Sequence, residues 1–295
     1  MKVWLNGQVL EASEARISPL DRGFLLGDGL FETLACHQGA PFLWEEHLDR
    51  LEASAKALDI GFPGRAMLRD AVMWVVAANG LAHADAARVR ITLTRGEGGE
   101  GGGVWPDEVL APTVLVTASP VHLPAGLAED GAAAITSAVR AVAGAPTHKS
   151  TSFQPNVLAK GEARRAGAWE ALLRNERGEV AEGATSNVFA VRAGELHTPP
   201  PEAGILPGVT RAFVLRMARD LGITAEESAL RPQALAGAGE AFLTSSLAGI
   251  VPLVRLDGEP IGSGAPGPVT RRLQRAYLQK SRGVSETGIR REATM

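Results

Sequence analysis

The chain has 295 residues, of which 45% are hydrophobic, and its formal net charge is −3. This length is enough for two domains with a well-buried core, and the near-neutral charge argues against nucleic acid or a charged membrane as a partner. The longest apolar run, residues 71–78, is too short to cross a bilayer, and the first residues lack the apolar stretch of a signal peptide. The single cysteine, Cys36, excludes an internal disulfide framework. We therefore expect a compact cytoplasmic protein.

The first part of the chain is predicted to form a small α+β domain over residues 1–118. Period-two alternation of apolar residues indicates strands, and spacing of three to four indicates helices. The predicted elements are strands at 2–5, 87–94 and 109–118 and helices at 45–58 and 66–78.

A glycine-rich loop, residues 96–103, follows the strand at 87–94. It lacks the Lys-Ser or Lys-Thr pair and the following helix of a phosphate-binding loop, so no nucleotide site is expected there. So many glycines make a segment flexible, which leaves two interpretations open: a lid over a substrate site, or a plain surface loop.

A linker is predicted at residues 119–126, which contain two prolines and a glycine. Beyond it, short strands alternate with helices, which predicts a larger α+β domain over residues 127–281. The polar tail, residues 282–295, is predicted to be disordered. The helices of the larger domain are expected near 156–166, 211–221 and 269–278.

Lys149 and Glu182 are the residues that indicate a chemistry most specifically. A lysine amine can hold pyridoxal phosphate as a Schiff base, and a carboxylate beside the ring nitrogen can keep it protonated, so that the ring accepts electrons. Taken alone, neither residue indicates a function: Lys149 could be a solvated surface lysine, and Glu182 an ordinary glutamate in a turn. His148 is left out of the site, because neighbouring side chains of a strand point to opposite faces.

A possible phosphate site lies just before the helix at 211–221. Gly208 and Thr210 would lie at the N-terminus of this amphipathic helix. Unpaired backbone N–H groups and the positive end of the helix dipole favour an anion there. The alternative is an ordinary glycine and threonine helix start.

Six blocks of the chain carry a resemblance: residues 21–33, 47–51, 147–160, 182–189, 208–211 and 242–246. In this order they resemble the class IV pyridoxal phosphate enzymes, which comprise branched-chain aminotransferases, D-amino acid aminotransferases and aminodeoxychorismate lyases. The resemblance covers nearly the whole chain. It implies the two-domain fold type IV with the cofactor at the domain interface. It also implies a homodimer, in which a loop of one subunit helps to close the other's active site.

The resemblance also implies residue roles. Lys149 would be the Schiff-base lysine and proton shuttle, and Glu182 the partner of the pyridine nitrogen. Arg50 would bind the cofactor phosphate, for which its planar fork of donors is suited. The other implied cofactor contacts are the Leu206 side chain against the ring, the backbone of Val209 and Thr210, and the hydroxyls of Thr210 and Ser246.

The substrate side departs from the family's patterns. Glu100 stands where the lyases have an arginine, and Phe31 where the D-amino acid enzymes have a tyrosine. Residues 88–90 read Arg-Val-Arg where branched-chain enzymes have Tyr-Ile-Arg. Arg90, with Arg88 on the same strand face, is the predicted carboxylate-binding group, and the alternative is a solvated strand face. The other expected substrate contacts are an apolar wall of Phe31, Trp105 and Leu206, and Ser245.

Other catalytic motifs are absent from the sequence. It contains no Gly-x-Ser-x-Gly, no His-Glu-x-x-His and no cysteine pair, and its six histidines lack ligand spacing, so no metal site is expected. We expect a pyridoxal phosphate-dependent aminotransferase that moves an amino group from an amino acid or primary amine to a 2-oxo acid. One alternative is an aminodeoxychorismate lyase, which forms 4-aminobenzoate and pyruvate. The other is a catalytically silent protein that binds the cofactor.

Overall fold

The computed structural model describes residues 1–98, 103–106, 110–143 and 147–287, and they form two compact units. Unit 1 comprises the described residues of 1–122, 148–153 and 281–287, and unit 2 those of 123–147 and 154–280. Within the described ranges, no helix is both long enough and apolar enough to cross a membrane. The same ranges hold no group of three or more side chains suited to bind a metal ion.

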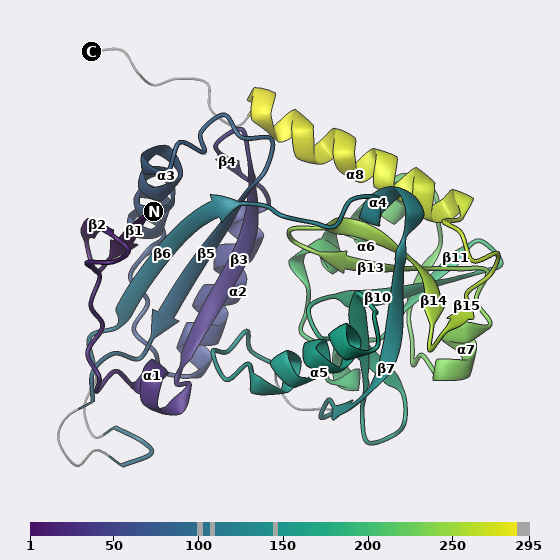
Figure 1. Ribbon diagram of the computed structural model, residues 1–295, viewed down its shortest axis with the longest axis horizontal. Helices are drawn as coiled ribbons and strands as arrows, with labels where there is room; N and C mark the ends of the chain where they lie inside the picture. Colours follow the sequence, from purple (N-terminus) through teal and green to yellow (C-terminus); the bar gives the residue numbers. More distant parts are fainter. Residues whose placement is uncertain (99–102, 107–109, 144–146, 288–295) are drawn as a thin grey trace. The chain divides into compact units, whose positions relative to one another are not determined.

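Unit 1 contains an antiparallel sheet, for which the described residues give the strand order β2-β1-β6-β5-β3-β4. Helices α2 and α3 cover one face of this sheet (Figure 1). Its elements are β1 (Lys2–Leu5), β2 (Gln8–Glu11), α1 (Arg22–Leu26), β3 (Gly29–His37), β4 (Ala40–Pro41), α2 (Trp44–Ala57), α3 (Arg65–Ala78), β5 (Ala87–Thr94) and β6 (Thr113–Pro120).

Alternation along β5 separates the two faces of this sheet. Val89 and Ile91 are completely buried and pack with residues of α2 and α3. Arg88, Arg90 and Thr92 lie between these apolar positions and therefore face away from the helices. The face opposite α2 and α3 thus carries two arginines on a single strand.

The predicted elements of the small domain are confirmed with small shifts. The two helices begin and end within one residue of the predicted bounds, and strands β1 and β5 match them. The strand predicted at 109–118 is instead β6, which runs from Thr113 to Pro120, and residues 107–109 lie outside the described ranges. The partner strand sets these ends, because Ala87 of β5 pairs with Pro120 and Thr94 pairs with Thr113.

Unit 2 contains a mixed sheet, with the strand order β12-β11-β10-β13-β14-β7-β8-β9 and β15 beside β14 among the described residues. Three of these pairs, β11 with β12, β14 with β7 and β7 with β8, are parallel. The strands are β7 (Ala132–Arg140), β8 (Glu170–Arg174), β9 (Val180–Gly183), β10 (Asn187–Arg192), β11 (Glu195–Thr198), β12 (Ala225–Glu227), β13 (Glu240–Ser245), β14 (Gly249–Leu256) and β15 (Glu259–Pro260). The helices are α4 (Leu127–Asp130), α5 (Gln154–Arg165), the 3-10 helix η1 (Pro201–Ala203), α6 (Val209–Asp220), α7 (Pro232–Ala236) and α8 (Pro268–Thr287).

The α+β class is confirmed, but three details of the predicted domains are corrected. The boundary between the units lies after His122, inside the predicted linker, yet residues 119–120 still belong to β6. Lys149 was assigned to the larger domain, whereas residues 148–153 belong to unit 1 because they pair with β3. The tail was predicted to be disordered, but α8 continues through residues 282–287; residues 288–295 lie outside the described ranges.

Candidate active site

Lys149 lies in a short segment that extends the sheet of unit 1. Its carbonyl accepts a hydrogen bond from Phe31 N at 2.8 Å, and Thr151 N donates to Gly29 O at 2.9 Å. Leu30 and Ser150 form an antiparallel bridge between these two bonds. Residues 149–151 therefore lie beside the first residues of β3, and this pairing fixes the face to which the Lys149 side chain points.

The Lys149 amine lies on the face of the sheet that carries the arginines. Its Nζ is 4.6 Å from the ring centroid of Phe31, and the Arg90 guanidinium carbon is 3.8 Å from the same centroid. Phe153 packs its ring edge-on against Phe31 at 5.3 Å. His148 instead makes a 3.1 Å hydrogen bond to Ser54 of α2, so the predicted separation of His148 from Lys149 is confirmed.

Arg90 is a partly buried cation. Burial lowers the pKa of Arg90 from its usual value, and the neighbouring charge of Arg88 lowers it further. Its Nε donates to the Thr92 hydroxyl at 3.2 Å. Arg88 is exposed on the same face of β5, two residues away. Two like charges, one of them partly desolvated, favour an anion at this surface.

Arg50 points to a buried carboxylate of β3. Its Nε and one terminal nitrogen each donate to Glu32 at 2.8 Å, and His47 Nδ1 is 2.7 Å from the same carboxylate. Burial alone would raise the pKa of Glu32, but the Arg50 charge and the His47 and Arg50 hydrogen bonds lower it to about 2. The motifs of the sequence indicate Arg50, but they do not indicate Glu32 and His47, the groups that fix its side chain and its carboxylate partner.

In unit 2, Glu182 of β9 is held by two hydrogen-bond donors. Its Oε2 accepts from Leu206 N at 3.0 Å and from the Asn187 side-chain amide at 3.1 Å. The same amide nitrogen donates to Leu206 O at 3.0 Å. The structure therefore brings Glu182 and the backbone of Leu206 together, and their roles at one cofactor ring stay predictions. Asn187, which also holds Glu182, was not singled out from the sequence.

A second buried carboxylate fixes the turn that precedes Asn187. Glu170 of β8 is completely buried and accepts hydrogen bonds from the Thr185 hydroxyl at 2.8 Å and the Ser186 hydroxyl at 2.9 Å. Lys160 of α5 lies 3.2 Å from the same carboxylate and neutralises it. Buried charges require such pairing, and here it holds the turn between β9 and β10 in one conformation.

The N-terminus of α6 lies next to Asn187. Gly208 is the N-cap, and a Cβ added there would be 1.9 Å from Asn187 Oδ1, so any other residue would have to displace the Asn187 side chain. Val209 and Thr210 are buried in the first turn, where backbone N–H groups have no helical acceptor. Ser245 is the last residue of β13 and Ser246 begins the turn that follows, and the Ser245 hydroxyl accepts from Ala248 N at 3.3 Å.

The groups of unit 2 suit a phosphate ester that carries a basic ring nitrogen. The first turn of α6 offers N–H donors, Thr210 adds a hydroxyl, and the Glu182 carboxylate is fixed in direction. Thr244, beside Asn187 in the sheet, has a buried hydroxyl without a hydrogen-bond partner among the described residues. Such a group costs free energy unless a ligand or water satisfies it. The residues present therefore fit pyridoxal phosphate.

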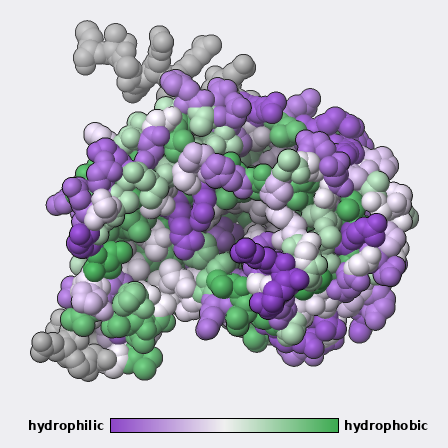
Figure 2. Space-filling view, viewed as in Figure 1, coloured by the Kyte–Doolittle hydropathy of each residue, from purple (hydrophilic) through white to green (hydrophobic). Residues whose placement is uncertain are grey.

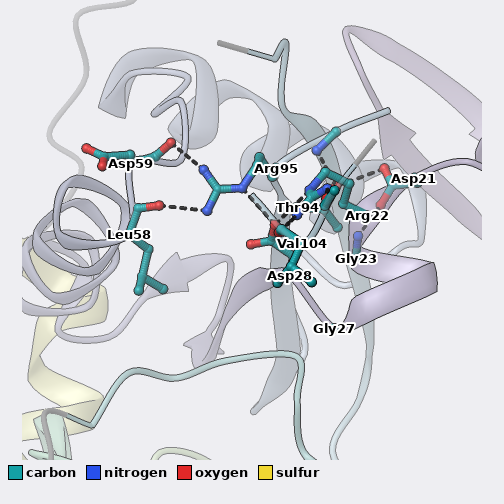
Figure 3. A network of polar contacts seen from close by, with 12 residues as sticks. Asp21, Arg22, Gly23, Gly27, Asp28, Leu58, Asp59, Thr94, Arg95 and Val104 are labelled. Carbon is teal, nitrogen blue, oxygen red and sulfur yellow. Dashed lines mark hydrogen bonds and ion pairs between the residues drawn. The ribbon is translucent and has the colours of Figure 1, made fainter. Parts of the chain in front are cut away.

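The described ends of the glycine-rich loop are held by an ion-pair network around Asp28 (Figure 3). The Asp28 carboxylate accepts from Arg22 Nε at 2.9 Å and from Arg95 Nε at 2.7 Å. Arg22 also donates to the carbonyls of Gly103 and Val104. Burial of Asp28 would raise its pKa, but the hydrogen bonds and charges of the two arginines outweigh this and lower it.

Trp105 follows this network, and its ring centroid lies 4.9 Å from the Arg95 guanidinium. Its side chain is 62% exposed, and its predicted part in a substrate wall stays a prediction. Residues 99–102, which include Glu100, lie outside the described ranges, so both interpretations of the loop remain open.

Comparisons with known proteins identify relatives along nearly the whole chain. The family model described as amino-transferase class IV matches residues 29–256. A Methanocaldococcus jannaschii protein with a provisional branched-chain-amino-acid aminotransferase name is 37% identical over 281 residues, which cover 94% of this chain and 95% of that protein. A D-alanine aminotransferase of Bacillus licheniformis is 34% identical over 287 residues, which cover 95% of this chain and 97% of that protein. The solved branched-chain aminotransferase of Thermoproteus uzoniensis with norvaline has a TM-score of 0.87 and 31% identity, over 97% of this chain and 96% of that one.

Proposed function

The chain belongs to the class IV aminotransferases, and from this we propose that its amino donor is an amino acid whose carboxylate is bound by Arg90. The enzyme depends on pyridoxal phosphate and passes the amino group to a 2-oxo acid. The observation that carries the proposal is that Arg90 and Lys149 contact the same aromatic ring. The Arg90 guanidinium carbon lies 3.8 Å and the Lys149 Nζ 4.6 Å from the centroid of the Phe31 ring.

Lys149 and Glu182 are the proposed catalytic residues. When bound, pyridoxal phosphate supplies an aldehyde that condenses with amines and a ring that takes up the electrons of a broken bond. Lys149 would hold the cofactor through Nζ, and once free its amine would move the α-proton of the donor as a general base and acid. Glu182 keeps a proton on the ring nitrogen. Its two hydrogen bonds to Asn187 and Leu206 support this role, because they hold the carboxylate in one orientation.

The cofactor phosphate is proposed to bind Arg50, the first turn of α6 and the hydroxyls of Thr210 and Ser246. The bidentate hydrogen bonds from Arg50 to Glu32 support the assignment, because they order the guanidinium before a ligand arrives. The side chain of Leu206 would pack against the cofactor ring, and the hydrogen bonds of its backbone to Glu182 and Asn187 support this assignment.

Arg90 is proposed to distinguish amino acids from simple amines. The Phe31 ring contacts both the Arg90 guanidinium and the Lys149 amine and so fixes the distance between them. Ser245 contributes a hydroxyl on the substrate side. A charge-assisted hydrogen bond contributes roughly 1.5–3 kcal/mol, which corresponds to about tenfold to a hundredfold in affinity.

The test compares Arg90→Met with Arg88→Met, its exposed neighbour on the same face of β5. Bleaching of the visible band of the lysine-bound cofactor is followed with D- and L-amino acids and with the amines that lack their carboxylate. We expect wild type to prefer amino acids and Arg90→Met to raise their KM by about tenfold or more, with a smaller effect of Arg88→Met. An unchanged KM in Arg90→Met would contradict the proposal.

The two alternative functions have less support. The relatives described above are aminotransferases, and the lyase interpretation finds no support among them. Release of pyruvate from aminodeoxychorismate, without conversion of the cofactor by amino acids, would favour the lyase. A silent cofactor-binding protein would show neither reaction.

A homodimer in the cytoplasm completes the proposal. Helix α1 exposes three consecutive apolar side chains, Phe24, Leu25 and Leu26, with Phe24 77% exposed. Figure 2 shows hydrophobic surface in this region of unit 1, and exposed apolar patches favour association. Light scattering with an activity assay tests the assembly, and Phe24→Ser should weaken it. A fully active monomer would overturn the homodimer.

The single cysteine, which is buried, supports the cytoplasmic location.

A further inference from the structure

Tyr277, the only tyrosine of the chain, packs against Gly249, at the end of the Ser246 turn that is proposed to bind phosphate. A Cβ added to Gly249 would lie 2.8, 3.3 and 3.4 Å from three atoms of the Tyr277 ring. Gly249 has a φ of +63° and begins β14, directly after the turn that carries Ser246. The ring therefore fills the space of the missing side chain and fixes the end of this turn.

The same side chain also contacts α6, whose first turn is proposed to bind phosphate. The Tyr277 ring packs edge-on against Phe213, with ring centroids 5.8 Å apart and an interplanar angle of 76°. Its hydroxyl hydrogen bonds the Thr210 side chain in the first turn of that helix. One residue of α8 thus contacts both segments proposed to bind phosphate, the Ser246 turn by its ring at Gly249 and the start of α6 by its hydroxyl at Thr210.

We infer that Tyr277 is a positioning residue that holds the Thr210 hydroxyl and the Ser246 turn in the arrangement that binds the cofactor phosphate. This inference rests on the proposed function, which assigns Thr210 and Ser246 to the phosphate. Tyr277 itself touches neither cofactor nor substrate in this account.

The chemistry of the phenol suits this role. Burial raises the pKa of Tyr277 to about 12, against a smaller lowering by the Thr210 hydrogen bond, so the hydroxyl keeps its proton at neutral pH. In the inferred arrangement with phosphate bound, the protonated phenol donates to Thr210 Oγ1, which leaves the threonine hydroxyl hydrogen directed to the anion. In such a chain of hydrogen bonds, each bond polarises and strengthens the next.

The variant Tyr277→Phe tests the role of the hydroxyl without disturbing the packing of the ring. Phenylalanine keeps the ring against Gly249 and Phe213 and removes only the hydroxyl. We expect the variant to bind pyridoxal phosphate and inorganic phosphate roughly three- to tenfold more weakly, the range of one neutral hydrogen bond. Its affinity for pyridoxal, which has no phosphate, should match that of wild type.

The binding experiment uses the full chain, stripped of cofactor, with Gln279→Ala as the control on the exposed side of α8. Equal affinities of Tyr277→Phe and wild type for phosphate would overturn the inference, as would an equal loss for pyridoxal. Thr210→Val tests the proposed function separately. If Thr210→Val binds phosphate more weakly while Tyr277→Phe does not, the proposed phosphate site is supported and the role of Tyr277 is contradicted. If the phosphate affinity of Thr210→Val equals that of wild type, both the proposed phosphate site and the role of Tyr277 are contradicted.

A spectroscopic test needs no variant of Tyr277, because a single tyrosine gives a single signal. With tyrosine labelled with ¹³C at Cζ, the one resonance should shift when inorganic phosphate is added to the full chain. The shift should disappear in Thr210→Val and persist in Gln279→Ala. A resonance that does not respond to phosphate in wild type would overturn the inference, even if Tyr277→Phe failed to fold.

Discussion

Two buried carboxylates, Glu32 in unit 1 and Glu170 in unit 2, hold residues of the proposed site in place. Each is completely buried and paired with cationic side chains, Glu32 with Arg50 and Glu170 with Lys160. Such a pair is costly to break, because removal of one partner leaves an uncompensated buried charge. Sequence motifs indicated Lys149 and Glu182 because their chemistry is specific. They did not indicate Glu32, because the sequence of a strand does not reveal which arginine will pair with its glutamate in the folded protein.

The first prediction concerns Glu32→Gln, which removes the charge that orients Arg50. We expect the variant to lose about 3 kcal/mol or more of unfolding free energy and to bind pyridoxal phosphate more weakly. Calorimetry and cofactor titration measure the two effects. The control is Glu45→Gln at the exposed pair with Arg65, where solvent screens the charges and little change is expected. Equal stability of the two variants would contradict the assignment.

The second prediction is the pH dependence that Glu32 confers. Its pKa is about 2 in the folded protein against a usual value of 4.5, so the unfolded chain takes up the proton first as pH falls. The stabilisation is present above the unfolded value and is lost as pH falls from about 5 to about 2. Urea unfolding across this window should show the gap between wild type and Glu32→Gln shrinking towards acid pH. A gap independent of pH would show that Glu32 is not the titrating group.

At the scale of elements, local pattern predicted α2, α3 and β5 because each has a regular apolar period. The pairing of residues 149–151 with β3 could not be predicted, since more than a hundred residues of chain separate the two segments. The continuation of α8 beyond residue 281 was also missed. Its polar composition resembles a disordered tail, whereas the preceding turns are fixed by long-range contacts such as the ion pair of Lys280 with Asp220.

The third prediction belongs to the start of α6. Gly208→Ala would place a Cβ 1.9 Å from Asn187 Oδ1 and so displace the amide that holds Glu182. We expect a loss of about 1–3 kcal/mol in stability and a slower half-reaction with amino acids. Gly239→Ala is the matched control in unit 2, because its nearest contact to an added Cβ is an ordinary 3.6 Å. Comparable effects of the two substitutions on the half-reaction would contradict the role of Asn187.

At the scale of the whole molecule, the α+β class and two units were predictable from the strand and helix alternation and the proline-containing linker. The assignment of Lys149 to unit 1 was not, because the chain there returns to unit 1 for only six residues, 148–153, before it enters unit 2 again. Such a return leaves no mark in composition or length. The residue that resembles the catalytic lysine therefore belongs to a different unit from Glu182, although both were expected in one domain.

The central claim is that this chain transfers amino groups by means of Lys149. The most direct measurement follows the visible absorbance of the bound cofactor in wild type and Lys149→Ala, first with an amino acid donor and then with a 2-oxo acid. We predict that wild type loses the band with the donor and regains it with the 2-oxo acid, through many cycles. Lys149→Ala should show neither change at a comparable rate. Cycling of Lys149→Ala at the wild-type rate would contradict the account.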